Sequence, residues 1–347
     1  MLAKALTKQS AGIVLAVVAV IVALAVPGSD LLPREGVLML GAFAMAAVLW
    51  ICESLPVGIT GILALVLTML LGIATPVEAF SGFASPTWFY LLGAFSLSAV
   101  FSQTSYGMRL VVFLLRKTKG DARLIVLAFM ASAWLLSSVM SDTAAVLMFI
   151  GIAKGILDAL GCRPRESNFG RCLYIGLLYG AIVGGFATLA GGPNNMAVPQ
   201  ISGISVSIVE WMIVGVPMAV VMLPICWFFV TRAFPPETFP VEQYEAIIAQ
   251  TEELGCPTLQ ERKALAFVIL MPVLWIAGNW VPALNVTVVA LLGLVIAFLP
   301  GVRLLTWDQY QRSVPWVVLI MIGSVFSLST LMVKTGVIGF GGHLVEA

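Results

Sequence analysis

Ser141-Asp142-Thr143 is a short polar stretch inside a long apolar segment of this sequence, and Gly191-Gly192-Pro193-Asn194-Asn195 is a second one. In hydrocarbon, every backbone polar group needs an internal partner, so irregular backbone is kept only where protein or a water-filled cavity surrounds it. A carboxylate at such depth is costly and marks a functional site by default. The two stretches therefore predict a binding site formed where two helices are interrupted inside a membrane.

The composition places the whole chain in a membrane. Hydrophobic residues make up 61% of the 347 residues and charged residues 10%, with a formal net charge of +1, whereas a soluble domain has about 25% charged residues. This balance gives no reason to expect a nucleic-acid partner. The single histidine, His343, and the five scattered cysteines show no metal-ligand spacing. We therefore expect neither a metal cofactor nor an enzyme.

Apolar segments long enough to cross a bilayer, about 20 residues each, predict an all-α polytopic membrane protein. The expected spans cover about residues 11–27, 36–53, 56–73, 86–115, 172–202, 207–231, 264–281, 285–300 and 314–333. Lys4 and Lys8 before the first span are also typical of a signal peptide. We interpret that segment as an uncleaved span, because no clear small-x-small cleavage site follows it.

The basic residues predict the topology. With a cytoplasmic N-terminus, every lysine and arginine except Arg34 and Lys334 lies in an inner segment, as the positive-inside rule requires. This agreement needs the apolar stretch 122–160 to enter and leave on the same side, as a re-entrant hairpin with its tip at Ser141-Asp142-Thr143. The alternative, two very short spans, would reverse every later loop. Residues 235–262, which are acidic with apolar residues at helix-face spacing, predict an amphipathic cytoplasmic helix docked against protein.

Three segments recur in the same order and predict an internal repeat. Val48–Ile51 returns as Val273–Ile276, Val57–Gly72 resembles Val286–Gly301, and Phe95–Ser98 returns as Phe326–Ser329. The predicted topology gives the matched spans opposite directions, which indicates an inverted-repeat transporter. The counterpart of the hairpin tip would fall beyond Ala347, so we expect the second repeat to be incomplete and the chain to be an N-terminal portion.

The two polar stretches supply groups that suit an anion and a hard cation. Asp142 or Ser141 would cap the returning helix, whose free N–H groups offer a partial positive charge to an anion. Carbonyls at the interrupted helix ends, together with hydroxyls, suit sodium. Either stretch alone is explained equally well as a helix cap or a kinked surface loop. A buried Asp142 would also be accounted for by protonation or a nearby cation.

These residues resemble the divalent anion:sodium symporter family of sodium-coupled dicarboxylate, citrate and sulfate carriers. The hairpin-tip signature of that family, Ser-Asn-Thr, is matched by Ser141-Asp142-Thr143, with Ser137 four residues earlier. Its second signature, Gly-Thr-x-x-Gly-(Ser/Thr)-Pro-Pro-Asn, is matched by Ala187 to Asn195. A Trp-x-x-Glu-x-x-Pro element is present as Trp50, Glu53 and Pro56.

The resemblance implies a homodimer that works by an elevator mechanism, with a fixed scaffold and a moving transport domain. Mapped on this chain, it implies scaffold spans in 1–121, a transport-domain half in 122–234 (hairpin 122–160, broken span 172–202, span 207–231), the linker 235–262 and the start of the second repeat in 263–347. The sodium ligands would be Ser137, Ser141, Asp142 and Gly191. The substrate-binding residues would be Ser141, Asp142, Thr143, Gly192 and Asn195.

Two departures from the family pattern bear on the substrate. Asp142 stands where the family has asparagine, and two unit charges about 4 Å apart repel by about 4 kcal/mol at an effective dielectric constant near 20. A dicarboxylate would therefore bind weakly unless Asp142 is protonated or paired with a cation, whereas sodium would bind more tightly. Gly192 and Asn194 remove a hydroxyl and a proline, which leaves the substrate class open.

The sequence thus predicts a secondary active transporter of the cell inner (plasma) membrane that couples sodium to the import of a small anion of the dicarboxylate, citrate or sulfate class. Sodium, as coupling ion, would be the only cofactor-like species. The alternative is a proton-coupled or cation-exchanging carrier that uses Asp142 as the titrating group and carries a non-dicarboxylate substrate. A channel or a membrane enzyme is disfavoured, because neither a continuous polar pore nor a nucleophile–base pair is visible.

Overall fold

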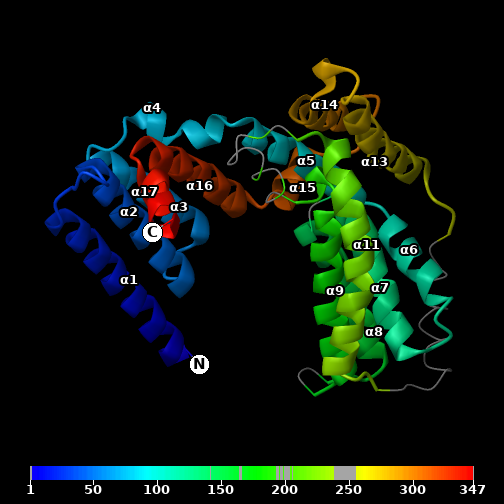
Figure 1. Ribbon diagram of the computed structural model, residues 1–347. Coiled ribbons are helices and arrows are strands. Elements are labelled where there is room, and N and C mark those ends of the chain that lie inside the picture. Colours follow the sequence, from blue (N-terminus) through cyan, green and yellow to red (C-terminus); the bar gives the residue numbers. More distant parts are fainter. Residues whose placement is uncertain are drawn as a thin grey trace. The chain divides into compact units, whose positions relative to one another are not determined.

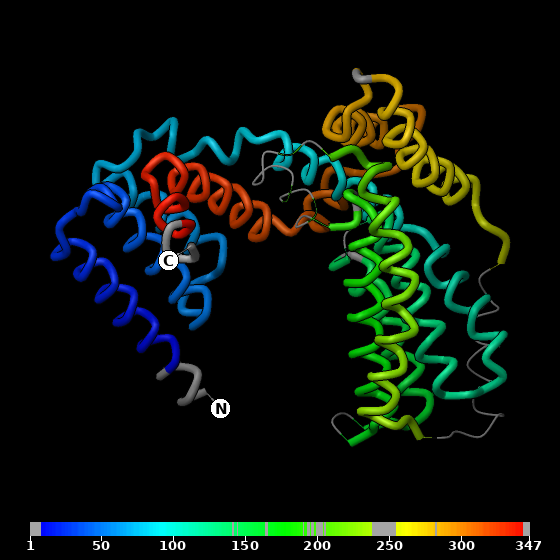
Figure 2. Tube along the Cα trace, viewed as in Figure 1, coloured from blue at the N-terminus to red at the C-terminus, as the bar shows by residue number. Residues whose placement is uncertain are grey.

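The computed structural model of the chain describes residues 2–140, 142–163, 166–192, 195, 198, 204, 206–237 and 255–346, apart from the side chains of residues 2–7, 144, 190, 282 and 343–346. All regular secondary structure of these residues is helical (Figures 1 and 2), which confirms the predicted all-α fold.

The helices follow the predicted apolar segments closely. They are α1 (Leu2–Ala25), α2 (Arg34–Cys52), α3 (Val57–Leu70), α4 (Pro76–Ala79), η1 (Ser81–Ala84), α5 (Pro86–Ser102), α6 (Tyr106–Leu115), α7 (Ala122–Ser137), α8 (Asp142–Ala159), α9 (Asn168–Phe186), η2 (Leu189–Gly191), α11 (Ile208–Ala233), α13 (Leu259–Ala277), η3 (Pro282–Leu284), α14 (Val286–Phe298), α15 (Trp307–Ser313), α16 (Trp316–Lys334) and α17 (Val337–Glu346). Among the described residues, α2, α9, α11, α16 and Lys8–Ala25 of α1 have the length and apolar composition needed to cross a membrane. The chain is therefore a polytopic membrane protein, as predicted.

The expected fourth span, 86–115, is divided, and this prediction was wrong. It forms α5 and α6, separated by residues 103–105. The hydroxyls of Ser102 and Thr104 donate to the carbonyls of Ala99 (2.9 Å) and Phe101 (2.7 Å), which takes up acceptors at the end of α5. Such local bonds offer the backbone an alternative to continuing the helix.

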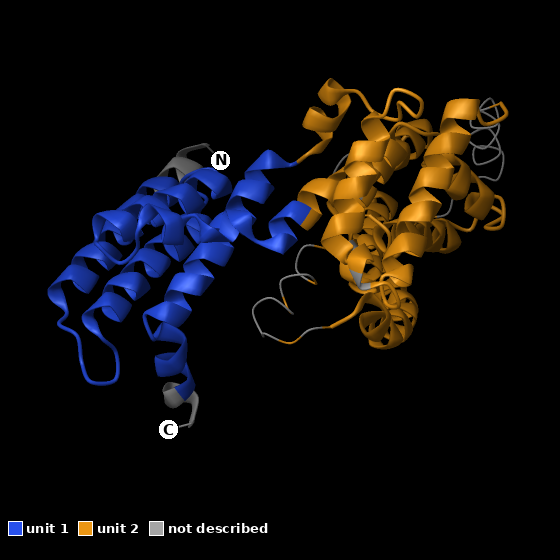
Figure 3. Cartoon of the chain, turned by 90° about the horizontal axis from the view of Figure 1, so that it is seen from above, with its two compact units in different colours: residues 1–89, 315–347 blue, residues 90–314 orange. Residues whose placement is uncertain are grey.

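The chain separates into two compact units, coloured differently in Figure 3. Unit 1 comprises residues 1–89 and 315–347, and unit 2 comprises residues 90–314. In unit 1, α2 packs on α1 and α3 packs on α16. The core of unit 1 includes Met39, Leu49, Leu65 and Leu328, all almost fully buried. Unit 1 is thus built from the two ends of the described chain.

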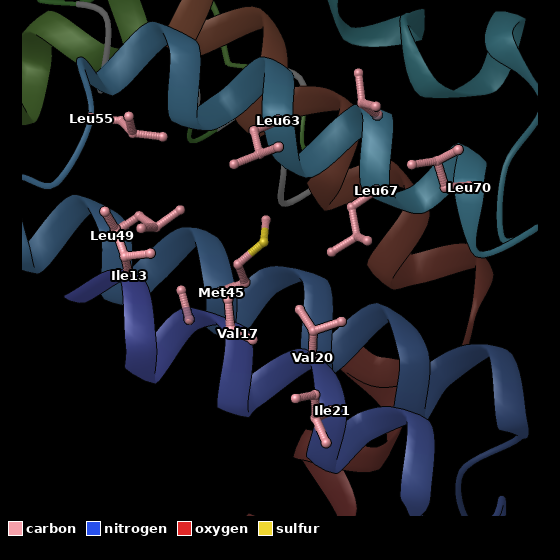
Figure 4. A pocket seen from close by; sticks show the side chains of 12 residues that line it. Ile13, Val17, Val20, Ile21, Met45, Leu49, Leu55, Leu63, Leu67 and Leu70 are labelled. Carbon is pink, nitrogen blue, oxygen red and sulfur yellow. The ribbon is translucent and has the colours of Figure 1, made fainter. Parts of the chain in front are cut away.

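A cavity of about 370 Å³ in unit 1 lies among α1, α2 and α3 (Figure 4). Its wall contains Ile13, Val17, Met45, Leu49 and Leu63, and its other lining residues are apolar as well. An anion or a hard cation needs polar groups in such a wall. The cavity is therefore not the predicted ion and substrate site, which must be sought in unit 2.

The two basic residues that the predicted topology leaves on the outside both have structural partners in unit 1. The guanidinium of Arg34 donates to the carbonyls of Ala23 (2.7 Å) and Leu24 (2.7 Å) at the C-terminal end of α1. Lys334, in the last turn of α16, donates to the carboxylate of Glu78. Positive charge at the C-terminus of a helix is stabilising, which gives both residues a role independent of topology.

In unit 2, a stripe of glycines brings two helices into close contact. Gly176, Gly180 and Gly184 recur every four residues along α9 and face α7. A Cβ placed on Gly180 would lie 2.5 Å from the carbonyl oxygen of Met130, and one on Gly184 would overlap with the carbonyl oxygen of Trp134. Small residues at this spacing let the backbones of two helices approach closely. The stripe therefore brings the C-terminal end of α9 next to that of α7.

The predicted linker, 235–262, lies largely outside the described residues, but carboxylates at both of its ends are attached to helix N-termini of unit 2. Glu237 accepts hydrogen bonds from Asn168 N (2.7 Å) and Phe169 N (2.6 Å) at the start of α9. Glu261 accepts one from Ser105 N (2.9 Å) at the start of α6. Carboxylates are stabilising at helix N-termini. These bonds favour the predicted docking against protein, while the amphipathic helix itself stays a prediction.

The recurring sequence segments make equivalent contacts. The indole of Trp50 donates to Val57 O (3.0 Å), and its counterpart Trp275 donates to Val286 O (3.2 Å). In unit 1, a Cβ on Gly61 would lie 2.6 Å from the Ser324 side chain. In unit 2, the counterparts of these two residues, Ala290 and Gly93, pack on each other in the same close manner. The contacts support the repeat, and the opposite direction of its two copies stays a prediction.

We expect Gly180→Ala to destabilise the protein by about 1–3 kcal/mol, because the new methyl group meets rigid backbone of α7. The matched control is Gly155→Ala in α8, where a Cβ meets nothing within 4 Å. This control should be neutral or stabilising, since alanine is the better helix former. Thermal unfolding of both variants in detergent measures the difference. Equal unfolding temperatures for the two variants would contradict the role of the stripe.

Hydrogen bonds from Ser105 and Thr258 lower the pKa of the Glu261 carboxyl from its usual value of 4.5 to about 2. A lowered pKa means that this carboxylate stabilises the fold above the unfolded-state pKa, and that its contribution is lost as the pH falls through about 2. We therefore expect Glu261→Gln to lower the unfolding temperature at pH 7, and the difference from wild type to shrink toward pH 2. Asp158→Asn, which removes an exposed carboxylate paired with Lys154 in α8, should show a smaller effect at pH 7.

Candidate functional site

The first polar stretch is a helix break, as predicted. Helix α7 ends at Ser137 and α8 begins at Asp142. Between them, Val139 N and Met140 N both donate to Leu136 O, at 3.0 and 2.9 Å, so the chain turns tightly at the end of α7. Ser141, predicted as both a sodium and a substrate ligand, lies outside the described residues.

The second break begins earlier than predicted. Helix α9 ends at Phe186, and a 3-10 turn, η2, follows before Gly192 takes up an extended conformation. The predicted break at residues 191–195 was therefore placed about one helical turn too late. Side chains from elsewhere take the carbonyls that end α9: Trp211 donates to Phe186 O (2.9 Å) and Asn195 donates to Gly185 O (2.7 Å). Pro193 and Asn194 lie outside the described residues.

The two breaks are in direct contact. The hydroxyl of Thr188, after α9, donates to Ser138 O (2.6 Å), after α7. The amide of Asn195 also donates to Thr188 O (2.7 Å), so Asn195 links Gly185 to the turn that follows it. These bonds fix the end of α9 to the end of α7 within unit 2.

Gly185 lies at the centre of the predicted sodium ligands. A Cβ placed there would lie 3.1 Å from Ser137 Oγ, 3.2 Å from Gly191 O and 3.5 Å from Asp142 Cβ. The structure thus brings three of the four predicted sodium ligands together around one glycine. Any larger residue at position 185 would occupy the space between them.

Ser137 carries the clearest signal of a ligand in this site. Its side chain is fully buried, and its hydroxyl has no hydrogen-bond partner among the described residues. A buried hydroxyl without a partner costs about 1–3 kcal/mol, so its presence needs an explanation. Ser132, also buried on α7, shows the ordinary arrangement, with its hydroxyl donating to Ala128 O at 2.7 Å. Hydroxyl, carbonyl and carboxylate oxygens are the groups that a hard cation prefers, so the residues present fit sodium.

Asp142 stands at the N-terminus of α8 and is half-buried. Its Oδ1 accepts a hydrogen bond from Thr143 N at 2.7 Å and lies 3.4 Å from Thr143 Oγ1. In the part of the chain that the structure describes, no lysine or arginine nitrogen lies within 4.0 Å of this carboxylate. Thr143 itself is exposed on the first turn of α8. The carboxylate is thus held by the helix end without a cationic side chain.

Sequence reasoning missed Gly185, Thr188 and Ser138 as parts of this site. Gly185 could have been found from the spacing of Gly176, Gly180 and Gly184, which indicates a helix face pressed against a neighbour just before the break. The hydrogen bond between Thr188 and Ser138 joins residues that are 50 positions apart, and no local pattern in the sequence indicates it.

Comparison with known proteins shows the family of the chain. Residues 7–347 match the family model described as the sodium:sulfate symporter transmembrane region. The chain belongs to this family. Membership confirms the resemblance drawn from the two polar stretches, and it places the chain in a family of membrane symporters rather than among enzymes.

Two relatives of this sodium:sulfate symporter family member show how far the similarity extends. The sodium-dependent dicarboxylate transporter SdcS of Staphylococcus aureus (strain bovine RF122 / ET3-1) is 26% identical over 343 residues, which cover 91% of this chain and 66% of the relative. An uncharacterized transporter of Haemophilus influenzae is 27% identical over 311 residues, which cover 86% and 65%. The chain therefore spans slightly less than two thirds of the length of either relative. Neither comparison favours the proton-coupled or cation-exchanging alternative.

We expect Ser137→Ala to raise the sodium concentration needed for half-maximal binding or uptake by about tenfold or more. We take the loss of one oxygen ligand of the ion to cost about as much as the loss of a hydrogen bond to a charged group, about 1.5–3 kcal/mol, and about 1.4 kcal/mol is tenfold. Titration with sodium at fixed substrate measures the change.

Ser132→Ala is the matched control, since it removes a buried hydroxyl from the same helix. If Ser137 were merely an unpaired core residue, Ser137→Ala would leave sodium dependence unchanged and raise the unfolding temperature. That result would remove Ser137 from the sodium site.

Proposed function

We propose that this chain contributes a cation site and an adjoining anion site to a secondary active transporter of the plasma membrane, which couples sodium entry to the uptake of a small anion of the dicarboxylate, citrate or sulfate class. One observation carries the proposal: the buried hydroxyl of Ser137, which has no hydrogen-bond partner among the described residues, lies where the ends of α7 and α9 meet Asp142 and Gly191. The name of the S. aureus relative supports both the sodium dependence and the substrate class.

In this proposal, sodium assembles the site. Ser137 Oγ, the Gly191 carbonyl and the Asp142 carboxylate surround the ion, with Ser141 as a further ligand from the hairpin tip. An ion bound there joins the two helix breaks, in addition to the hydrogen bond between Thr188 and Ser138 that already connects them. Occupation of the cation site thus stabilises the arrangement that the anion requires, which is the basis of coupling.

The anion would bind against the start of α8. The partial positive charge of that helix end favours negative charge, and the exposed Thr143 offers a hydroxyl there. Gly192, in extended conformation, and Ser141 complete the proposed contacts. The amide nitrogen of Asn195 donates to Gly185 O and Thr188 O, so we assign Asn195 to positioning the second break beside the anion in addition to its proposed substrate contact.

The remaining expectations of the family also stand as proposals. We propose a homodimer and an elevator mechanism in which the transport half, residues 122–234, moves relative to a scaffold. The glycine-lined contact of α7 with α9 supports this assignment, because it makes the two interrupted helices a single rigid group that can move without disturbing the site.

The test is uptake by the full-length protein in liposomes. With sodium replaced by choline at fixed pH, uptake of labelled succinate, citrate and sulfate should fall to the level of empty liposomes. An imposed inward sodium gradient should restore uptake of at least one of the three. Unchanged uptake in choline would refute sodium coupling, and ion currents far above carrier turnover would indicate a channel instead.

A further inference from the structure

Asp142 gives the cation site a formal negative charge that the family pattern lacks. A Cβ placed on Gly185 would lie 3.5 Å from the Cβ of Asp142, and it would also lie close to Ser137 Oγ and Gly191 O. In the part of the chain that the structure describes, no lysine or arginine forms an ion pair with Asp142. A sodium ion bound here is therefore the nearest compensating charge for Asp142.

The charge balance of the site follows from this placement. With an asparagine at position 142, one bound sodium would leave the site with a charge of +1, available to attract an anion. With Asp142, the same ion leaves the described part of the site neutral. A partly buried charge without a compensating partner is costly. With Asp142 in place, the charge of the bound sodium is already compensated, so it no longer compensates one negative charge of the transported anion.

The orientation of the carboxylate strengthens this effect on the anion. Oδ1 of Asp142 accepts a hydrogen bond from Thr143 N at 2.7 Å. This N–H is one of the donors at the start of α8. The proposed docking place of the anion is this same helix end. The carboxylate thus both repels a second negative charge and takes a donor that such a charge would use.

We infer that Asp142 determines the charge of the transported anion, and that the site selects a small carboxylate with a single negative charge over a dianion of the same shape. The inference rests on the proposed function, and it shifts the preferred substrate from the dianions of that class to a related carboxylate with one negative charge. A dicarboxylate in which one carboxyl group is replaced by a neutral amide has the required chemistry.

The test compares succinate, which carries two charges at pH 7.5, with its monoamide succinamate, which has nearly the same shape and carries one. Saturable sodium-dependent uptake of both is measured with the full-length protein in liposomes at saturating sodium. Wild type should prefer succinamate. Asp142→Asn should shift the ratio of the two affinities toward succinate by at least about tenfold, which corresponds to about 1.4 kcal/mol.

Two further variants keep the result interpretable. Asp142→Ser removes the same charge and keeps a residue suited to the start of a helix, so it should shift the ratio in the same direction. Asp158→Asn removes a charge from the exposed far end of the same helix, where Asp158 pairs with Lys154, and should leave the ratio unchanged.

Three results would overturn the inference: a wild type that takes up succinate in preference to succinamate, a wild type that takes up neither, or an unchanged ratio in both Asp142 variants. An unchanged ratio with more sodium ions coupled per anion in wild type than in Asp142→Asn would show that an additional cation compensates the charge instead. Sodium dependence is measured separately by choline replacement, so failure of this inference leaves the proposed function standing.

Discussion

A helix that ends in apolar surroundings leaves backbone groups that must find partners, and the structure of unit 2 follows from how they do so. At the end of α9, Trp211 and Asn195 donate to the carbonyls of Phe186 and Gly185. At the end of α7, the hydroxyl of Thr188 donates to Ser138 O. These side chains lie outside the helices whose carbonyls they bond. Each helix end therefore has its hydrogen-bond partners only when the segments that carry those side chains are packed against it. Among the described residues, the hydroxyl of Ser137 is left without a hydrogen-bond partner at this junction, as is the indole N–H of Trp134 one turn earlier on α7.

The sequence predicts those features whose cause is local. Polar residues in an apolar run indicate the break between α7 and α8, because Asp142 and the neighbouring hydroxyls favour a helix end over a continuous helix. The end of α9 was predicted too late, because its cause is tertiary: Trp211 and Asn195 end the helix at Phe186. The division of the expected fourth span has local causes, the hydroxyls of Ser102 and Thr104, and also a tertiary one that the sequence does not indicate. The carboxylate of Glu261, 156 residues away, accepts the hydrogen bond of Ser105 N at the start of α6.

The sequence predicted which residues belong to the candidate site better than it predicted how they are arranged. A family signature supplied Ser137, Asp142 and Gly191, and the structure brings them together around Gly185, which no signature supplied. The hydroxyl of Ser132 bonds within its own helix, whereas that of Ser137, next to Gly185 at the helix end, has no partner among the described residues. Two serines on one apolar helix are indistinguishable in composition, so only the packing of α9 against α7 separates a core residue from a ligand.

The discontinuity of unit 1 has a consequence for biosynthesis. Unit 2 is one continuous stretch, residues 90–314, whereas unit 1 joins residues 1–89 to residues 315–347. Because chains are made from the N-terminus and domains fold as units, the helices of residues 1–89 can complete unit 1 only after all of unit 2 has been made. Until α16 has been made, α3 lacks the helix whose Ser324 packs on Gly61. During that time lipid or the insertion machinery must cover the apolar face of α3.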